Sequence, residues 1–149
     1  MNFKQQCYTA CLQLVDTNIR AIRNRLQQLS ESVQEDTKST AGDKHETGRA
    51  MIHLEQENTN KQLQEALEQK SVLETIDISI VAPCIVKGSL VKTNKGYLFI
   101  STGLGKVNVD GTIVFALSPQ SPLGKLLMGQ SVNNTATINN ITYVIEEIL

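Results

Sequence analysis

Apolar residues in the first part of the chain recur at intervals of three and four. One series comprises Cys11, Val15, Ile19, Ile22, Leu26, Leu29 and Val33. This spacing places one apolar side chain per turn on the same face of a helix, as in the heptad stripe of a coiled coil. A second helical pattern has Met51, Leu54, Leu63, Leu67 and Leu73 on one side. Two such helices joined by a short turn are expected to fold back antiparallel, which predicts a long helical hairpin.

The short segment AGDKHE separates the two helical patterns. Gly42 suits the end of the first helix, because glycine readily adopts a left-handed conformation. Asp43 suits the N-cap position of the second helix, and Glu46 follows three residues later at the capping-box position. At about 1.5 Å per residue, arms of roughly thirty residues form a rod of about 50 Å. The two acids are therefore expected at its tip.

The second half of the chain is rich in Val, Ile, Thr, Gly and Asn, which is typical of short strands separated by turns. Hairpin turns are expected at Asn94-Lys95-Gly96, Asp110-Gly111 and Asn139-Asn140. Strands are expected at 76–81, 89–93, 97–101, 107–109, 112–117, 135–138 and 141–148.

One helix interrupts these strands. In SPLGKLLMG, Ser121 suits the N-cap, Pro122 the first helical position and Gly129 the stop. The predicted fold class is therefore α+β, with a helical coiled-coil hairpin over residues 1–75 and an antiparallel β domain with one short helix over residues 76–149.

Composition narrows the classes of function. The net charge is −1, and neither half has the basic excess of a protein that binds DNA or RNA independently. A polar start and the lack of a long apolar run predict a cytoplasmic protein without a membrane segment. The three cysteines agree with a reducing compartment. Cys7 and Cys11 lie one helical turn apart and are expected to be packing residues rather than metal ligands.

Two interpretations of Asp43 and Glu46 remain open. Their spacing fits a capping box that only starts a helix. It also fits an incomplete site for Mg²⁺, which takes one or two carboxylates and fills its other positions with water or phosphate. His45 lies between the two acids but is not expected to bind Mg²⁺, which prefers oxygen ligands.

The order of features resembles the bacterial Gre-type transcript cleavage factors. A helical hairpin with the tip GDKHE precedes a strand-rich domain that contains SPLGKLLMGQSV and ends in YVIEEIL. Members of that family carry a Gly-Asp-x-x-Glu-Asn tip and a Ser-Pro-x-x-x-x-Leu-x-Gly-x-x-Val segment in an FKBP-like C-terminal domain. The resemblance covers nearly the whole chain. This chain departs from the family at Thr47, Ala50 and Gln120, where Asn, Tyr and Asp are usual.

The resemblance implies an RNA polymerase accessory factor whose hairpin enters the secondary channel. Asp43 and Glu46 match the acids that help hold a second Mg²⁺ at the polymerase active site, where backtracked RNA is cleaved near its 3′ end. Ser121, Pro122 and Leu123 match the segment that docks on the polymerase. The chain itself would not be an enzyme, because the polymerase supplies the catalytic aspartates.

Further expectations concern the isolated protein and the alternatives. Two carboxylates are too few to hold Mg²⁺ without the polymerase. The protein is expected to be a monomer, and it would meet RNA only inside the polymerase complex.

The main alternative is a channel-binding modulator or inhibitor that does not stimulate cleavage. A prolyl isomerase is disfavoured, because Tyr97, Phe99, Phe115 and Tyr143 are expected to be core residues rather than the lining of a pocket. A generic coiled-coil adaptor would leave SPLGKLLMG unexplained.

Overall fold

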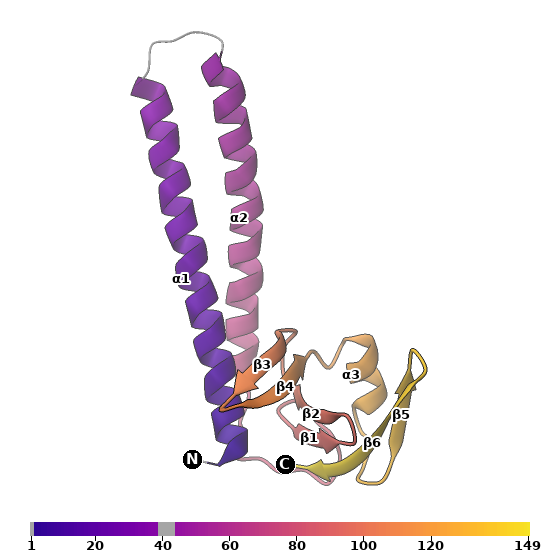
Figure 1. Ribbon diagram of the computed structural model, residues 1–149. Coiled ribbons are helices and arrows are strands. Elements are labelled where there is room, and N and C mark those ends of the chain that lie inside the picture. The colour runs from indigo at the N-terminus through magenta and orange to yellow at the C-terminus, as the bar shows by residue number, and fades with distance from the viewer. Residues whose placement is uncertain (1, 39–43) are drawn as a thin grey trace. The chain divides into compact units, whose positions relative to one another are not determined.

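The chain has an α+β architecture (Figure 1). The computed structural model describes residues 2–38 and 44–149, and of these the side chains of residues 36–38 and 44–46 are not described. Two long helices, α1 (Phe3–Lys38) and α2 (Lys44–Glu74), precede six strands and the short helix α3 (Pro122–Leu127). The strands are β1 (Leu90–Thr93), β2 (Gly96–Ile100), β3 (Gly105–Val109), β4 (Thr112–Leu117), β5 (Thr135–Ile138) and β6 (Ile141–Ile148).

Contacts divide the chain into two compact units. The helical unit is Val15–Glu68, and the sheet unit combines Met1–Leu14 with Gln69–Leu149. The start of α1 and the end of α2 therefore group with the strands. The end of α2 at Glu74 lies close to the predicted boundary between residues 75 and 76, although the division into domains 1–75 and 76–149 stays a prediction.

The helical unit has a small apolar interior. Val15 and Ile19 of α1 and Ala66 of α2 are buried, and Figure 1 shows the two helices side by side and running in opposite directions. The later members of the predicted α1 series are only half-buried: Ile22, Leu26, Leu29 and Val33. The apolar stripe of α1 is thus confirmed in its first part and becomes more exposed along the helix.

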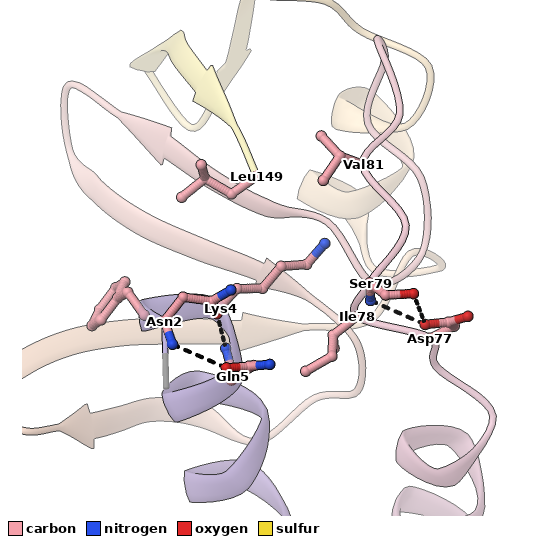
Figure 2. A pocket seen from close by; sticks show the side chains of 9 residues that line it. Asn2, Lys4, Gln5, Asp77, Ile78, Ser79, Val81 and Leu149 are labelled. Atoms are coloured by element: carbon pink, nitrogen blue, oxygen red, sulfur yellow. Dashed lines mark hydrogen bonds between the residues drawn. The ribbon is translucent and has the colours of Figure 1, made fainter.

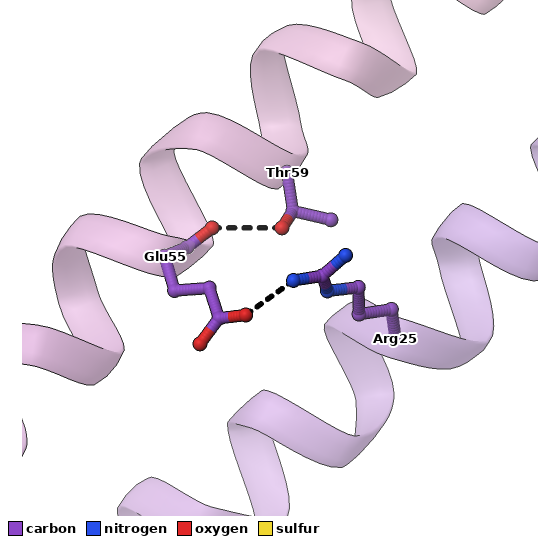
Figure 3. Close-up of polar contacts among 3 residues, drawn as sticks. All are labelled: Arg25, Glu55 and Thr59. Carbon is purple, nitrogen blue, oxygen red and sulfur yellow. Dashed lines mark hydrogen bonds and ion pairs between the residues drawn. The ribbon is translucent and has the colours of Figure 1, made fainter.

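Polar groups occupy part of the contact between α1 and α2 (Figure 3). Arg25 forms an ion pair with Glu55. Thr59 is buried, and its hydroxyl donates a hydrogen bond of 2.7 Å to the backbone carbonyl of Glu55. The buried hydroxyl therefore has its partner within its own helix, which avoids the cost of an unsatisfied polar group.

The predicted apolar stripe of α2 is wrong at two positions. Met51 and Leu54 are 68% and 58% exposed. The inward positions instead recur once per heptad, at Ile52, Thr59, Ala66 and Leu73, of which the last three are buried and the first is half-buried. Two of these four inward residues are a threonine and an alanine, which are not large apolar residues. A prediction based on large apolar residues alone therefore assigns the wrong face of α2 to the interior.

The six strands form one sheet in the order β3-β4-β2-β1-β6-β5. The strands predicted from residue 89 onward are confirmed. The turns at Asp110-Gly111 and Asn139-Asn140 have positive φ angles at both residues, as a tight two-residue hairpin requires.

The sheet differs from the predicted all-antiparallel arrangement in one pairing. β2 and β4 are parallel, with Tyr97 opposite Val114 and Ile100 opposite Leu117. β3 and β4 form a hairpin on the outside, so that β4 rather than β3 lies next to β2. Local hairpin signals predict which strands pair through short turns, but they carry no information on this longer connection.

The predicted strand at 76–81 is also wrong. The segment is a turn, in which the carboxylate of Asp77 accepts bonds from the backbone N–H of Ser79 at 3.0 Å and from its hydroxyl at 2.5 Å. Such a side-chain turn competes with a strand. Ile80 and Val81, which suggested an apolar strand, are exposed.

The sheet is buried on both faces. One face belongs to a core cluster that includes α3: Ile85, Val91, Leu98, Ile100, Leu117, Leu127, Ala136 and Ile145. The register places the side chains of Leu90, Phe99 and Ala116 on the other face, where all three are buried. Tyr97 shares this second face, and its ring centroid lies 4.9 Å from that of Phe3. The start of α1 therefore packs against the sheet within this unit.

Cys7 and Cys11 are packing residues, as predicted. Both are fully buried, and burial raises the pKa of Cys7 to about 11 and that of Cys11 to about 12. Thiolates are therefore scarce at these positions at neutral pH.

This burial predicts selective thiol labelling. Iodoacetamide at neutral pH is expected to modify Cys84, which is only half-buried, well before Cys7 or Cys11. Mass spectrometry of native and denatured protein measures the order of modification. Rapid labelling of Cys7 in the native protein would contradict the burial of the first turns of α1 within the sheet unit.

Neither long helix contains, within the described residues, an apolar stretch that could cross a lipid bilayer.

Candidate functional site

The two predicted metal-assisting acids are Asp43 and Glu46. Asp43 falls outside the described residues. The backbone of Glu46 belongs to the first turn of α2, but its side chain is outside the description. The choice between a capping box and a metal-assisting pair therefore stays open. Among the residues that are described, no three or more His, Cys, Asp or Glu side chains gather as metal ligands.

The predicted docking segment forms the start of α3, and its three residues have different roles. Ser121 is the N-cap: its hydroxyl accepts a bond from the N–H of Gly124 at 3.1 Å and donates one to the carbonyl of Ser118 at 2.7 Å. Leu123 is partly buried against the core cluster. Pro122 starts the helix with its ring exposed. Only Pro122 thus combines a place in the segment with an exposed side chain.

Gly124 is a residue of this segment that sequence reasoning missed. A Cβ atom added there would lie 2.1 Å from the carbonyl oxygen of Ser118. No side chain fits at that distance, so glycine allows the turn before α3 to pack onto the helix. The signal available in the sequence was a glycine inside a short helical pattern. Because glycine destabilises a helix, its presence there indicates that packing requires it.

An apolar groove runs beside α3. It encloses about 540 Å³, and its lining residues include Phe115, Pro122, Leu123, Ile138 and Tyr143. Phe115 is 41% exposed, so the expectation that it is a core residue is wrong. Phe99, by contrast, is fully buried as predicted.

The groove continues into a smaller hollow with basic residues. This hollow of about 240 Å³ shares Phe115 and Tyr143 with the groove and is also lined by Lys95 and Lys106. Apolar side chains and positively charged side chains therefore lie next to each other at this place.

No protein-family model, curated protein or solved structure matches this chain.

The arrangement is therefore interpreted from its own residues. An open groove with two aromatic side chains, an exposed proline and adjoining lysines suits the anchoring of an apolar side chain from another protein. These contacts favour a binding role for the face beside α3.

Proposed function

We propose that this chain is a Gre-type accessory factor of RNA polymerase with an FKBP-like C-terminal domain. The face beside α3 docks on the polymerase, and α1 and α2 form a coiled-coil hairpin that enters the secondary channel. Asp43 and Glu46 help coordinate a second Mg²⁺ there, and cleavage of backtracked RNA is stimulated. The factor acts in the cytoplasm as a monomer and is not an enzyme by itself.

The observation that carries the proposal is that α1 and α2 form a narrow pair of helices with a small apolar contact. Its contact is apolar at Val15, Ile19 and Ala66 and includes the Arg25–Glu55 ion pair farther along. Two helices side by side measure roughly 20 Å across, because each is about 10 Å wide with its side chains. Such an arm is narrow enough for a channel, and most of its exposed side chains are polar.

The proposed mechanism assigns a limited role to this chain. When bound in the complex, Mg²⁺ would lower the pKa of an attacking water and stabilise charge on the phosphate. The carboxylates of Asp43 and Glu46 would supply some of its oxygen ligands. The hairpin would hold these acids next to the reacting groups. The acids then need not reach the site by diffusion, which lowers the entropic cost of the reaction.

The proposal is tested by adding the purified chain to RNA polymerase halted in a backtracked complex. Co-sedimentation measures binding, and electrophoresis of end-labelled RNA measures cleavage. Both are expected. Binding without faster cleavage would favour the channel-binding modulator instead, and the absence of binding would overturn both functions.

Replacing Pro122 by Ala is expected to weaken polymerase binding without destabilising the fold. An exposed surface substitution changes the free energy of unfolding by about 0.5 kcal/mol or less, whereas loss of an anchoring residue costs more than about 1 kcal/mol of binding energy. We therefore expect a roughly tenfold rise in Kd, since 1.4 kcal/mol corresponds to a factor of about ten. Titration of labelled protein with polymerase measures it.

Two other substitutions serve as controls. Pro83→Ala removes an exposed proline outside the groove and should change neither binding nor stability. Ser121→Ala removes the N-cap and should cost about 1 kcal/mol of stability. Equal losses of stability and binding in Pro122→Ala would assign that proline a role in folding only.

A further inference from the structure

A second hollow lies within the sheet unit, away from α3 (Figure 2). It encloses about 530 Å³. The start of α1, the turn after α2 and the last residue of the sequence all contribute to its wall. The apolar lining residues are Phe3, Ile78, Val81 and Leu149, and the polar ones are Asn2, Lys4, Gln5, Asp77 and Ser79.

Among the described residues that line this hollow, Lys4 is the one with a basic side chain. Only 6% of the residue is exposed, and Figure 2 shows its side chain reaching toward the segment that carries Ile78 and Ser79. The ammonium donates a hydrogen bond of 2.9 Å to the backbone carbonyl of Ile80. The carboxylate of Asp77 acts on this ammonium electrostatically, and the hydrogen bond to Ile80 uses one of the ammonium's donors. An ammonium has three donors, which leaves capacity for an anionic ligand.

The N-terminus of α1 adds to the positive potential. The side chain of Asn2 accepts a bond from the N–H of Gln5 at 2.8 Å, and the side chain of Gln5 accepts one from the N–H of Asn2 at 3.0 Å. This reciprocal cap starts the helix at the edge of the hollow. The positive end of the helix dipole therefore lies near Lys4, where it favours a negative group.

Asp77 is the acidic side chain that faces the same hollow. It is exposed, and its hydrogen bonds to the hydroxyl and the N–H of Ser79 lower the pKa of its carboxyl group. Burial lowers the pKa of the Lys4 ammonium, and the charge of Asp77 opposes this effect. Water screens an exposed carboxylate more strongly than a buried ammonium. Among its described lining residues the hollow therefore has one buried ammonium and one exposed carboxylate.

We propose that this hollow binds a small amphiphilic carboxylate. The carboxylate accepts hydrogen bonds from the Lys4 ammonium beside the start of α1, and an alkyl or aryl body packs against Phe3, Ile78 and Val81. A single ammonium without an arginine matches a monoanion better than a phosphate, which binds best to several donors. The site is separate from the groove beside α3 and does not depend on the proposed role in transcription.

The test uses octanoate and the full-length chain. Titration followed by ¹H–¹⁵N NMR is expected to shift the amide signals of residues 3–5 and 78–81, with saturation in the millimolar range or below. Octanol has the same alkyl length without the charge, and octylammonium carries the opposite charge. Both are expected to bind at least tenfold more weakly than octanoate.

Two variants test the two halves of the site. Lys4→Met keeps an unbranched stem but removes the ammonium, and should weaken octanoate binding about tenfold or more, whereas Lys92→Met changes an exposed lysine outside the hollow and should have no effect. Val81→Asp adds a negative charge at a position that is 67% exposed, so the protein should fold and lose binding. Octanol binding as tightly as octanoate, unchanged binding by Val81→Asp, or no saturable shift with wild-type protein would each overturn the proposal.

Discussion

Stimulated RNA cleavage is expected to fall by about 100-fold or more when Asp43 is replaced by Asn and Glu46 by Gln. A catalytic metal ion supplies several kcal/mol of transition-state stabilisation, and each 1.36 kcal/mol changes a rate tenfold. The amide side chains keep the size of the acids but cannot supply the negative charge that holds Mg²⁺. The rate of RNA shortening in a backtracked complex, with the double variant in saturating amount, measures the loss.

The same double variant is expected to keep its fold and its binding to polymerase. Asn is a good N-cap, so the free energy of unfolding should change by no more than about 1 kcal/mol. A control with Glu57→Gln and Glu65→Gln removes two exposed acids from α2 and should leave cleavage unchanged. If the Asp43 and Glu46 variant stimulates cleavage as well as the wild type does, the two acids serve only as a helix cap.

Replacing Phe99 by Ala is expected to cost about 3–5 kcal/mol of stability, the range measured when a buried Phe is truncated. Phe99 is fully buried in β2, on the sheet face that also carries Leu90 and Ala116. Truncation removes its apolar contacts and leaves a cavity. A small domain is stable by only about 5–15 kcal/mol, so the loss is a large share. Urea denaturation followed by circular dichroism measures it.

Phe115→Ala is the matched control for this substitution. Phe115 lies on the neighbouring strand β4 and faces the groove beside α3, where it is 41% exposed. Its truncation should cost far less stability than that of Phe99 and should instead weaken polymerase binding. Similar losses of stability for the two variants would contradict the assignment of Phe99 to the core and of Phe115 to the wall of the groove.

Local signals in the sequence determined the short-range elements. Asp110-Gly111 and Asn139-Asn140 adopt the positive φ angles of tight hairpins, and Ser121 caps α3 in front of Pro122. In each case the responsible atoms lie within a few residues, so the chemistry of the segment is sufficient. The apolar stripe of α1 was equally readable at Val15 and Ile19, because large apolar residues mark its inner face.

For the candidate site, the sequence identified the residues of the segment but not their exposure or packing. The segment SPLG was recognisable, but the exposure of Pro122 and the packing of Leu123 depend on where α3 lies against the sheet. Phe115 was assigned to the core because an aromatic residue in a strand is usually buried. Phe115 pairs with the buried Leu98 of β2, yet it is 41% exposed because it lines the open groove beside α3.

Tertiary contacts alone decided the remaining features. α2 turns Thr59 and Ala66 inward and leaves Met51 and Leu54 exposed, because packing against α1 selects the face with smaller side chains. β4 lies parallel to β2, and Phe3 at the start of α1 contacts Tyr97. The hollow around Lys4 likewise joins residues from the start, the middle and the end of the chain. These arrangements depend on burial and contact between distant segments, whereas turns and caps depend on neighbouring atoms, and only the latter leave a pattern in the sequence.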